Sequence, residues 1–183
     1  ENAALYGLDN IGFSTQASFF DADNDGDLDM YLANRPLTFE GIYDESYEKY
    51  RFKNELGTHR MFINTDGKFK DISEKANVLS NGYGLSANLG DLNQDGKTDI
   101  YVCNDFIYPD FLYLNKGDGT FTDQARQMLK HTSNSSMGSD LVDFNNDGLV
   151  DIYTVDMVAE DNFRKKTNTN EDNYDSYIRM IKN

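Results

Sequence analysis

Asp21-Ala-Asp-Asn-Asp-Gly-Asp-Leu-Asp29 is the first of three similar nine-residue stretches that decide the fold of this chain. The second is Asp91-Leu-Asn-Gln-Asp-Gly-Lys-Thr-Asp99, and the third is Asp143-Phe-Asn-Asn-Asp-Gly-Leu-Val-Asp151. Each carries oxygen-bearing side chains at positions 1, 3, 5 and 9, with glycine at position 6, where the chain must turn sharply. This spacing directs several carboxylates at one centre, as a calcium ion with about six to eight oxygen ligands requires. We therefore predict three calcium sites.

Position 7 differs in chemistry among the copies, so only its backbone carbonyl is expected to contact the ion. Solvated turns are the alternative interpretation, because Asp, Asn and Gly dominate turns for purely local reasons. Three copies with the same positions filled favour calcium, and magnesium fits less well because it prefers a small octahedral shell. The predicted ligands are Asp21, Asp23, Asp25, Asp27 and Asp29 in the first loop, Asp91, Asn93, Asp95, Lys97 and Asp99 in the second, and Asp143, Asn145, Asp147, Leu149 and Asp151 in the third.

The stretches differ from EF-hand loops, which carry a bidentate Glu at position 12 and lie between two helices. Position 12 is Leu32, Val102 or Thr154 here, so the Asp at position 9 closes the cage instead. The residues that follow each stretch are β-prone runs such as Met30-Tyr-Leu-Ala33. We therefore predict that each calcium loop connects two strands.

Short β-like segments also precede each loop, with Phe19, Leu89 or Leu141 two residues before the first Asp. These apolar residues alternate with polar neighbours, which predicts half-buried strands with one wet face. After the first two loops, Asp66-Gly67 and Asp118-Gly119 stand between β-prone runs and indicate hairpins. The repeating unit is therefore strand, calcium loop, strand and hairpin, which makes four antiparallel strands.

Repeats built from four short strands are typical of β-propeller blades. We predict an all-β fold in which residues 1–183 form one partial β-propeller, with a short helical insertion and a C-terminal helix. Closed propellers contain about four to eight blades, so remaining blades or a partner chain are expected to cover the open strand edges. The expected boundaries are about 12–76 for the first blade with an insertion at 35–58, about 82–129 for the second, about 137–156 for the start of a third, and 157–183 for a connector and short helix.

The insertion is rich in aromatic residues, and Tyr43, Tyr47 and Tyr50 follow the spacing of one helical face. This stripe either packs on its own blade or forms a ligand-binding surface. Long insertions between strands are common places for binding function. Both interpretations stay open at this point.

The composition excludes several classes of function. The net charge is −15, from 32 acidic and 17 basic residues, and no basic patch appears, so nucleic-acid binding is not expected. No apolar run approaches the length of about 18 residues that a membrane span needs. Extracellular calcium modules bind weakly and fill where calcium is abundant, which predicts an extracellular or cell-surface location. A single cysteine, Cys103, rules out an internal disulfide and favours an exported bacterial protein.

The three loops with their Asp-Met-Tyr or Asp-Ile-Tyr sequels, and the hairpin Leu112-Tyr-Leu-Asn…Gly-Thr-Phe121, resemble the FG-GAP or VCBS repeat. This repeat is the blade unit of integrin-α-like β-propellers, in the variant found in cartilage-acidic-protein-like proteins and large bacterial surface proteins. The resemblance covers about residues 12–157 and implies calcium ligands at positions 1, 3, 5 and 9, with a carbonyl ligand at position 7. The Gly-Ala-Pro of the family name is absent, and Ala33-Asn34, Cys103-Asn104 and Val155-Asp156 stand in its place, which removes support for an integrin-like headpiece.

These features favour a non-catalytic, calcium-stabilised binding or adhesion scaffold of a secreted or cell-surface protein that recognises a protein or a glycan. An enzyme is disfavoured, because neither His59 nor His131 belongs to a recognisable nucleophile or zinc constellation. His59 is expected at the surface or in a cross-strand pair. The alternative is a carbohydrate-binding or accessory module of a larger extracellular enzyme.

Overall fold

The computed structural model describes residues 2–10, 12–36, 57–80, 82–105, 108–133 and 135–157. Strands dominate this part of the chain, and only two single helical turns accompany them. The predicted helical insertion, the C-terminal helix and the stripe of Tyr43, Tyr47 and Tyr50 lie outside the described residues. The elements are α1 (Ala3–Tyr6), β1 (Phe13–Phe20), β2 (Asp29–Arg35), β3 (Arg60–Thr65), β4 (Lys68–Asp71), β5 (Gly84–Gly90), β6 (Asp99–Asn104), β7 (Phe111–Asn115), β8 (Phe121–Asp123), α3 (Ala125–Met128), β9 (Ser136–Val142) and β10 (Asp151–Asp156).

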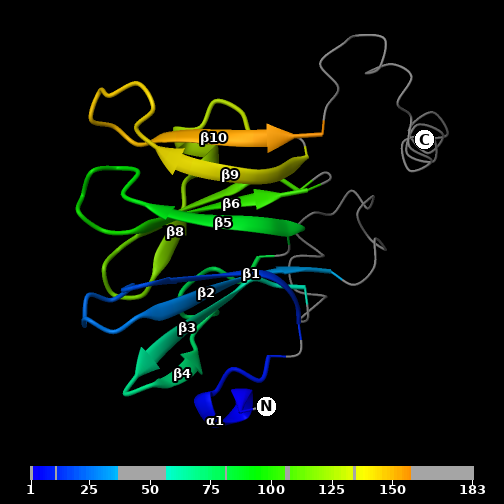
Figure 1. Cartoon of the computed structure of the whole chain (residues 1–183), viewed down its shortest axis with the longest axis vertical. Helices are drawn as coiled ribbons and strands as arrows, with labels where there is room; N and C mark the ends of the chain where they lie inside the picture. Colours follow the sequence, from blue (N-terminus) through cyan, green and yellow to red (C-terminus); the bar gives the residue numbers. More distant parts are fainter. Residues whose placement is uncertain are drawn as a thin grey trace, which may run out of the picture.

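The strands form antiparallel sheets that stack on one another (Figure 1). The first sheet has the order β1-β2-β3-β4, the second has the order β5-β6-β7-β8, and β9 pairs with β10 in a third. The first strands of the three sheets lie side by side, because β1 contacts β5 and β5 contacts β9. Sequential four-stranded sheets that meet along their first strands are the blades of a β-propeller. The prediction of an all-β, partial propeller is therefore confirmed.

Each acidic nonapeptide connects the first two strands of its sheet, as predicted. The three loops gather on the left side of the view in Figure 1. The third and fourth strands of the first sheet join through Asp66 and Gly67, whose φ angles are 54° and 76°. Two consecutive residues with positive φ match the twist of the flanking strands, and this explains why Asp-Gly occurs there.

Two apolar clusters hold the three sheets together. Tyr31 from β2 and Ile100 from β6 belong to the cluster between the first and second sheets. The cluster between the second and third sheets contains Tyr101, Cys103 and the partly buried Ile152. Alternate residues of β6 thus serve opposite faces of the second sheet, as strand geometry requires. Cys103 is fully buried in this core as a small interior side chain.

The expected wet face of the first strands is wrong for the first two sheets, where Ser18 is buried and Asn88 partly buried, whereas Asp140 of β9 is exposed. Leu89 packs in the cluster toward the first sheet and Leu141 in the cluster toward the second, so this position faces the preceding blade. Phe19 holds the same position in β1, where the described residues include no preceding sheet, and it is 50% exposed. Its polar neighbour Ser18 is 7% exposed, because it faces the next sheet and donates a hydrogen bond to the Ala87 carbonyl at 2.7 Å. Burial is set by the neighbouring blades rather than by one solvated face.

The two outer faces of the stack are covered to different extents. Leu8, which follows α1, packs against Met30, Leu32 and Phe62 on the outer face of the first sheet. On the outer face of the third sheet, Tyr153 is 65% exposed. The same alternation that buries Tyr31 and Tyr101 in the first two blades thus leaves an aromatic face open on the third.

The connection between the second and third strands closes in the same way in both four-stranded sheets. The Asn34 N–H donates to His59 Nδ1 at 3.2 Å, and the Asn104 N–H donates to Asp110 Oδ1 at 2.9 Å. His59 is therefore an interior acceptor beside Tyr31, fully buried, and its expected position at the surface is wrong. Burial lowers the pKa of His59 to about 4.

Candidate metal centre

All three predicted calcium loops have the same backbone shape. Position 4 lies in the left-handed region, with φ angles of 62° at Asn24, 60° at Gln94 and 59° at Asn146. The glycine at position 6 also has a positive φ, which is 95° at Gly26. The left-handed backbone explains why Asn stands at position 4 of two loops and Gly at position 6 of all three, since Asn tolerates this conformation and Gly adopts it without a Cβ clash.

The Asp at position 1 fastens each turn. Asp21 accepts hydrogen bonds from the N–H groups of Asp25 and Gly26, both at 3.1 Å. Asp91 and Asp143 accept the corresponding pair of bonds at 3.0 and 2.8 Å. The same turn therefore forms in three loops whose side chains at positions 2, 7 and 8 all differ.

The first loop brings three carboxylates together. One oxygen each from Asp21, Asp23 and Asp29 lies within 4.8 Å of the others. Asp23 Oδ1 is buried and has no hydrogen-bond partner. Burial, together with the negative charges of Asp25 and Asp21, raises the pKa of Asp23. An unpartnered buried oxygen among converging carboxylates fits a hard divalent cation, which favours the ionised form.

The Asp at position 9 ties each of the first two loops to the third strand of its own sheet. Asp29 is fully buried, and it accepts the N–H groups of Ala22 and Asn64, both at 2.8 Å. Asp99 is also fully buried and accepts the N–H groups of Leu92 at 2.9 Å and Asn115 at 2.8 Å. Burial raises the pKa of both carboxyls, although these hydrogen bonds oppose the shift. A cation beside them would offset the cost of burying the charge.

The third loop lacks one of these contacts. Asp151 Oδ2 is buried without a hydrogen-bond partner. In the other two loops the Asp at position 9 receives an N–H group from the third strand, and the described residues include no third strand in the sheet of β9 and β10. Asp151 is thus an acceptor whose donor in the repeat pattern is missing.

The second loop differs in charge from the first. Lys97 Nζ contacts Asp95 Oδ2 at 2.8 Å, and this hydrogen bond lowers the pKa of Asp95. The sequence analysis assigned only a backbone role to Lys97, yet its ammonium group neutralises a predicted ligand. The second loop should therefore attract a cation less strongly than the first.

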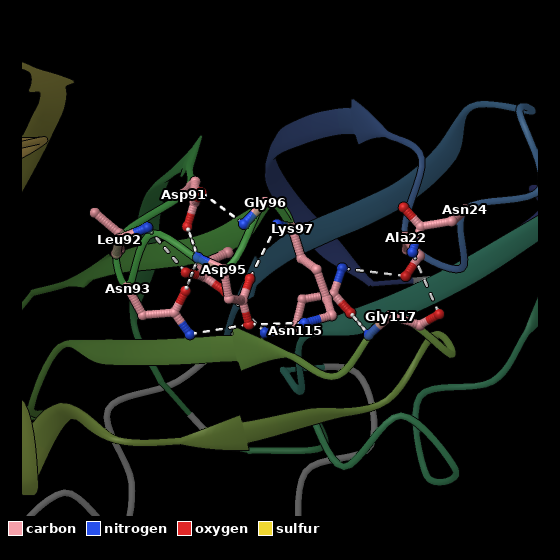
Figure 2. Close-up of polar contacts among 11 residues, drawn as sticks. Ala22, Asn24, Asp91, Leu92, Asn93, Asp95, Gly96, Lys97, Asn115 and Gly117 are labelled. Carbon is pink, nitrogen blue, oxygen red and sulfur yellow. Dashed lines mark hydrogen bonds and ion pairs between the residues drawn. The ribbon is translucent and has the colours of Figure 1, made fainter.

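Neighbouring blades contact one another at the loops (Figure 2). Asn115 Nδ2, at the end of β7, donates to the Ala22 carbonyl in the first loop at 3.1 Å. Asn24 Nδ2 reaches the Gly117 carbonyl at 3.3 Å, and Gln94 Nε2 reaches the Gly148 carbonyl at 3.2 Å. The sequence analysis missed Asn115. The available signal was that both hairpins carry Asn at the equivalent position, in Ile63-Asn64 and in Leu114-Asn115.

The three loops that carry the predicted ligands lie on one side of the propeller (Figure 1). Counting His, Cys, Asp and Glu side chains, the described residues contain one group of three or more with converging ligand atoms, the one in the first loop. Asn93 and Asn145 replace Asp23 at position 3 of the other loops, so those loops hold fewer carboxylates. No helix within the described ranges is long and apolar enough to span a membrane.

Stacked four-stranded blades with an acidic loop between their first and second strands define a β-propeller repeat protein. The family model described as an FG-GAP-like repeat matches residues 54–102 and 91–154, which together make up more than half of the chain. The chain belongs to the FG-GAP-like repeat family, as the sequence resemblance predicted.

Curated relatives share part of this sequence. Human cartilage acidic protein 1 is 34% identical over 84 residues, which cover 45% of this chain and 13% of that protein. The Xenopus tropicalis protein of the same name is 34% identical over 110 residues, covering 53% of this chain and 16% of the relative. The mouse protein is 33% identical over 84 residues, again 45% of this chain and 13% of its own length. The matches therefore span only a small part of these relatives.

Proposed function

We propose that this chain is a non-catalytic, calcium-stabilised scaffold that presents a protein- or glycan-binding surface on an extracellular protein. The observation that carries the proposal is the repeated loop: position 1 accepts the same two N–H groups in three loops of different sequence. The unpartnered buried oxygen of Asp23, among the converging carboxylates of the first loop, supports a cation there.

Calcium would act by joining the first two strands of each blade. The oxygens at positions 1, 3, 5 and 9 and the carbonyl at position 7 would hold the ion, and the positive charge would relieve repulsion between Asp21, Asp23 and Asp25. Because Asp29 and Asp99 also bind the third strand, each of the first two loops, once loaded, would fix three strands of its blade. Every step is one of binding and positioning, so no acid–base or nucleophilic role is assigned to these carboxylates.

The division of the chain into blades follows the repeat. We place the first blade at residues 12–76, the second at 82–129 and the start of a third at 137–156. Residues 35–58 are an insertion in the first blade and 157–183 a connector. The exposed faces at Phe19 and Tyr153 support further blades or a partner chain as the elements that complete the arc. An extracellular location suits weak calcium sites, and a bacterial source remains a prediction from sequence.

Calcium removal tests the proposal. We expect titration calorimetry to give three bound calcium ions per chain, with excess EDTA lowering the melting temperature. If each site's dissociation constant is about one hundredth of the free calcium concentration, each ion adds about 2.7 kcal/mol, so three ions shift the melting temperature by on the order of 20 °C. An unchanged melt in EDTA together with no calcium binding would refute the proposal.

A matched pair of variants controls for the general loss of negative charge. Asp143→Asn removes the carboxylate that fastens the third loop, and the stoichiometry should fall from three ions to two. Asp140→Asn removes an exposed carboxylate three residues earlier on β9, which accepts the N–H of its own neighbour Leu141, and should leave all three sites intact. Equal effects of the two variants would show that net charge, not the loop, governs binding.

A further inference from the structure

We propose that Asn115 couples the first two calcium loops, so that an ion in one loop raises the affinity of the other. This inference rests on the proposed calcium binding. Asn115 is a positioning residue in the argument, because it touches the loop backbone and a ligand's hydrogen-bond network rather than the ion itself.

A continuous chain of hydrogen bonds joins the two loops through Asn115. Asp29 at position 9 of the first loop accepts the Ala22 N–H at 2.8 Å. The Ala22 carbonyl accepts Asn115 Nδ2 at 3.1 Å. The Asn115 N–H then donates to Oδ1 of Asp99, which is position 9 of the second loop, at 2.8 Å. One residue therefore holds a carbonyl of the first loop, at Ala22 (Figure 2), and a carboxylate of the second, at Asp99.

All the residues that form this series of hydrogen bonds are buried. Asp29, Ala22 and Asp99 are fully buried, and Asn115 is 3% exposed. Buried hydrogen bonds have no water to replace them, so a displaced member leaves its partner unsatisfied. The two carboxylates therefore move together more readily than they move alone.

A second contact runs parallel to the first at the surface. Asn115 Oδ1 accepts the Gly117 N–H at 2.7 Å, and the Gly117 carbonyl accepts Asn24 Nδ2 from position 4 of the first loop at 3.3 Å. The side chain of Asn115 thus also shapes the β7–β8 turn on which the first loop rests. Both contacts cross the boundary between blades.

Positive coupling follows from the ordering that each ion requires. An ion in the first loop would fix the peptide groups around Ala22, which would fix Asn115 and with it Asp99. The second ion would then meet a carboxylate that is already ordered, and its binding would cost less conformational entropy. Coupling of this kind is reciprocal, so the second ion must favour the first by the same factor.

A double-mutant cycle with a separate signal for each loop tests the coupling. Gly26 and Gly96 each donate an amide to the Asp at position 1 of their own loop, so their NMR amide signals report calcium in the first and second loops separately. Asp95→Ala, at an exposed position, disables the second loop. We expect it to raise the dissociation constant of the first loop by about five-fold, at the lower end of typical couplings.

In the Asn115→Ala background, Asp95→Ala should leave the dissociation constant of the first loop unchanged. Asn115→Asp is the second variant, because it keeps an acceptor for Gly117 but offers no donor to the Ala22 carbonyl. Asn64→Ala and Asn64→Asp are the matched controls. Asn64 also donates its N–H to the position 9 Asp, at 2.8 Å, but no earlier loop precedes it within the described residues. These controls should leave the five-fold effect in place.

The outcomes separate this inference from the proposed function. If neither glycine signal responds to calcium in the unmodified chain, calcium binding fails and the coupling fails with it. If both signals respond but Asp95→Ala leaves the dissociation constant of the first loop unchanged, the sites bind calcium independently and the coupling is refuted. If the coupling persists in both Asn115 variants, another contact carries it and the role of Asn115 is refuted.

Discussion

Mild acid should destabilise this protein through one buried histidine. His59 is fully buried, and its Nδ1 accepts the N–H of Asn34 at 3.2 Å. The proton of the neutral ring must therefore sit on Nε2. Protonation of Nδ1 would set two N–H groups against each other and bury a positive charge. Burial accordingly lowers the pKa of His59 to about 4, against an ordinary value of about 6.5.

The size and the sign of the effect follow from these two values. The unfolded chain takes up the proton at the higher pH, so stability is complete above about pH 6.5 and falls as the pH decreases toward 4. The full difference of about 2.5 pKa units corresponds to about 3 kcal/mol. At pH 5, where ordinary Asp side chains are still mostly ionised, about 2 kcal/mol should already be lost.

Urea unfolding at pH 7.5 and 5.0 in saturating calcium measures this loss. The unmodified chain and the His59→Gln variant are compared, and the pH-dependent decrease in the free energy of unfolding should be about 2 kcal/mol smaller in the variant. His131→Gln, which replaces an exposed histidine, should behave like the unmodified chain. An equal decrease in His59→Gln and the unmodified chain would refute a depressed pKa at His59.

Three further predictions concern the loops and the open face. Lys97→Leu should raise the calcium affinity of the second loop several-fold in a calorimetric titration, because it frees Asp95 from an ammonium group; an unchanged affinity would contradict this. Gly148→Ala should lower the free energy of unfolding by about 1–2 kcal/mol, because φ is 85°, whereas Gly138→Ala should change it little. In urea unfolding, Tyr153→Ala should lower the free energy of unfolding by less than about 0.5 kcal/mol and Tyr31→Ala by about 3–5 kcal/mol. Similar losses in the two variants would mean that the outer face of the third sheet is covered.

Local patterns in the sequence were sufficient to predict the strands and loops. Asp at position 1 and Gly at position 6 define a turn through contacts only four or five residues apart, so the pattern is legible without the rest of the fold. The β-prone runs after each loop and the Asp66-Gly67 turn are equally local. Three copies of the pattern then indicated the propeller, because repetition of a four-stranded unit restricts the architecture to a few classes.

Burial was harder to predict because it depends on residues far apart in the chain. Phe19 and Leu89 occupy equivalent positions, but only Leu89 has a preceding blade within the described residues to pack against. His59 takes the place that Asp110 holds in the next blade, and neither residue lies in a motif that reveals this role. Alternation along one strand identifies two faces, but it does not tell which neighbour covers each face.

The contacts between loops were missed for a related reason. The sequence analysis treated each nonapeptide as a separate site, whereas Asn115 and Ala22, which join two of them, are 93 residues apart. Only the backbone carbonyl of Lys97 was given a role, because the side chain at position 7 differs among the three loops. Variation of a side chain does not exclude a charge effect, and the ion pair with Asp95 shows that effect.

The topology separates the acidic loops from the links between the second and third strands of the blades. The loops connect first to second strands, so the links from second to third strands must leave from the opposite ends of the blades. There, the Asn34 side chain donates to the Thr58 carbonyl at 2.6 Å, and the Asn104 side chain donates to the Pro109 carbonyl at 2.8 Å. These bonds close the base of each link without any contribution from the loops. The acidic loops and the links between second and third strands are therefore closed by separate sets of hydrogen bonds at opposite ends of the blades, so a change in the link after β2 leaves the contacts that shape the loops in place.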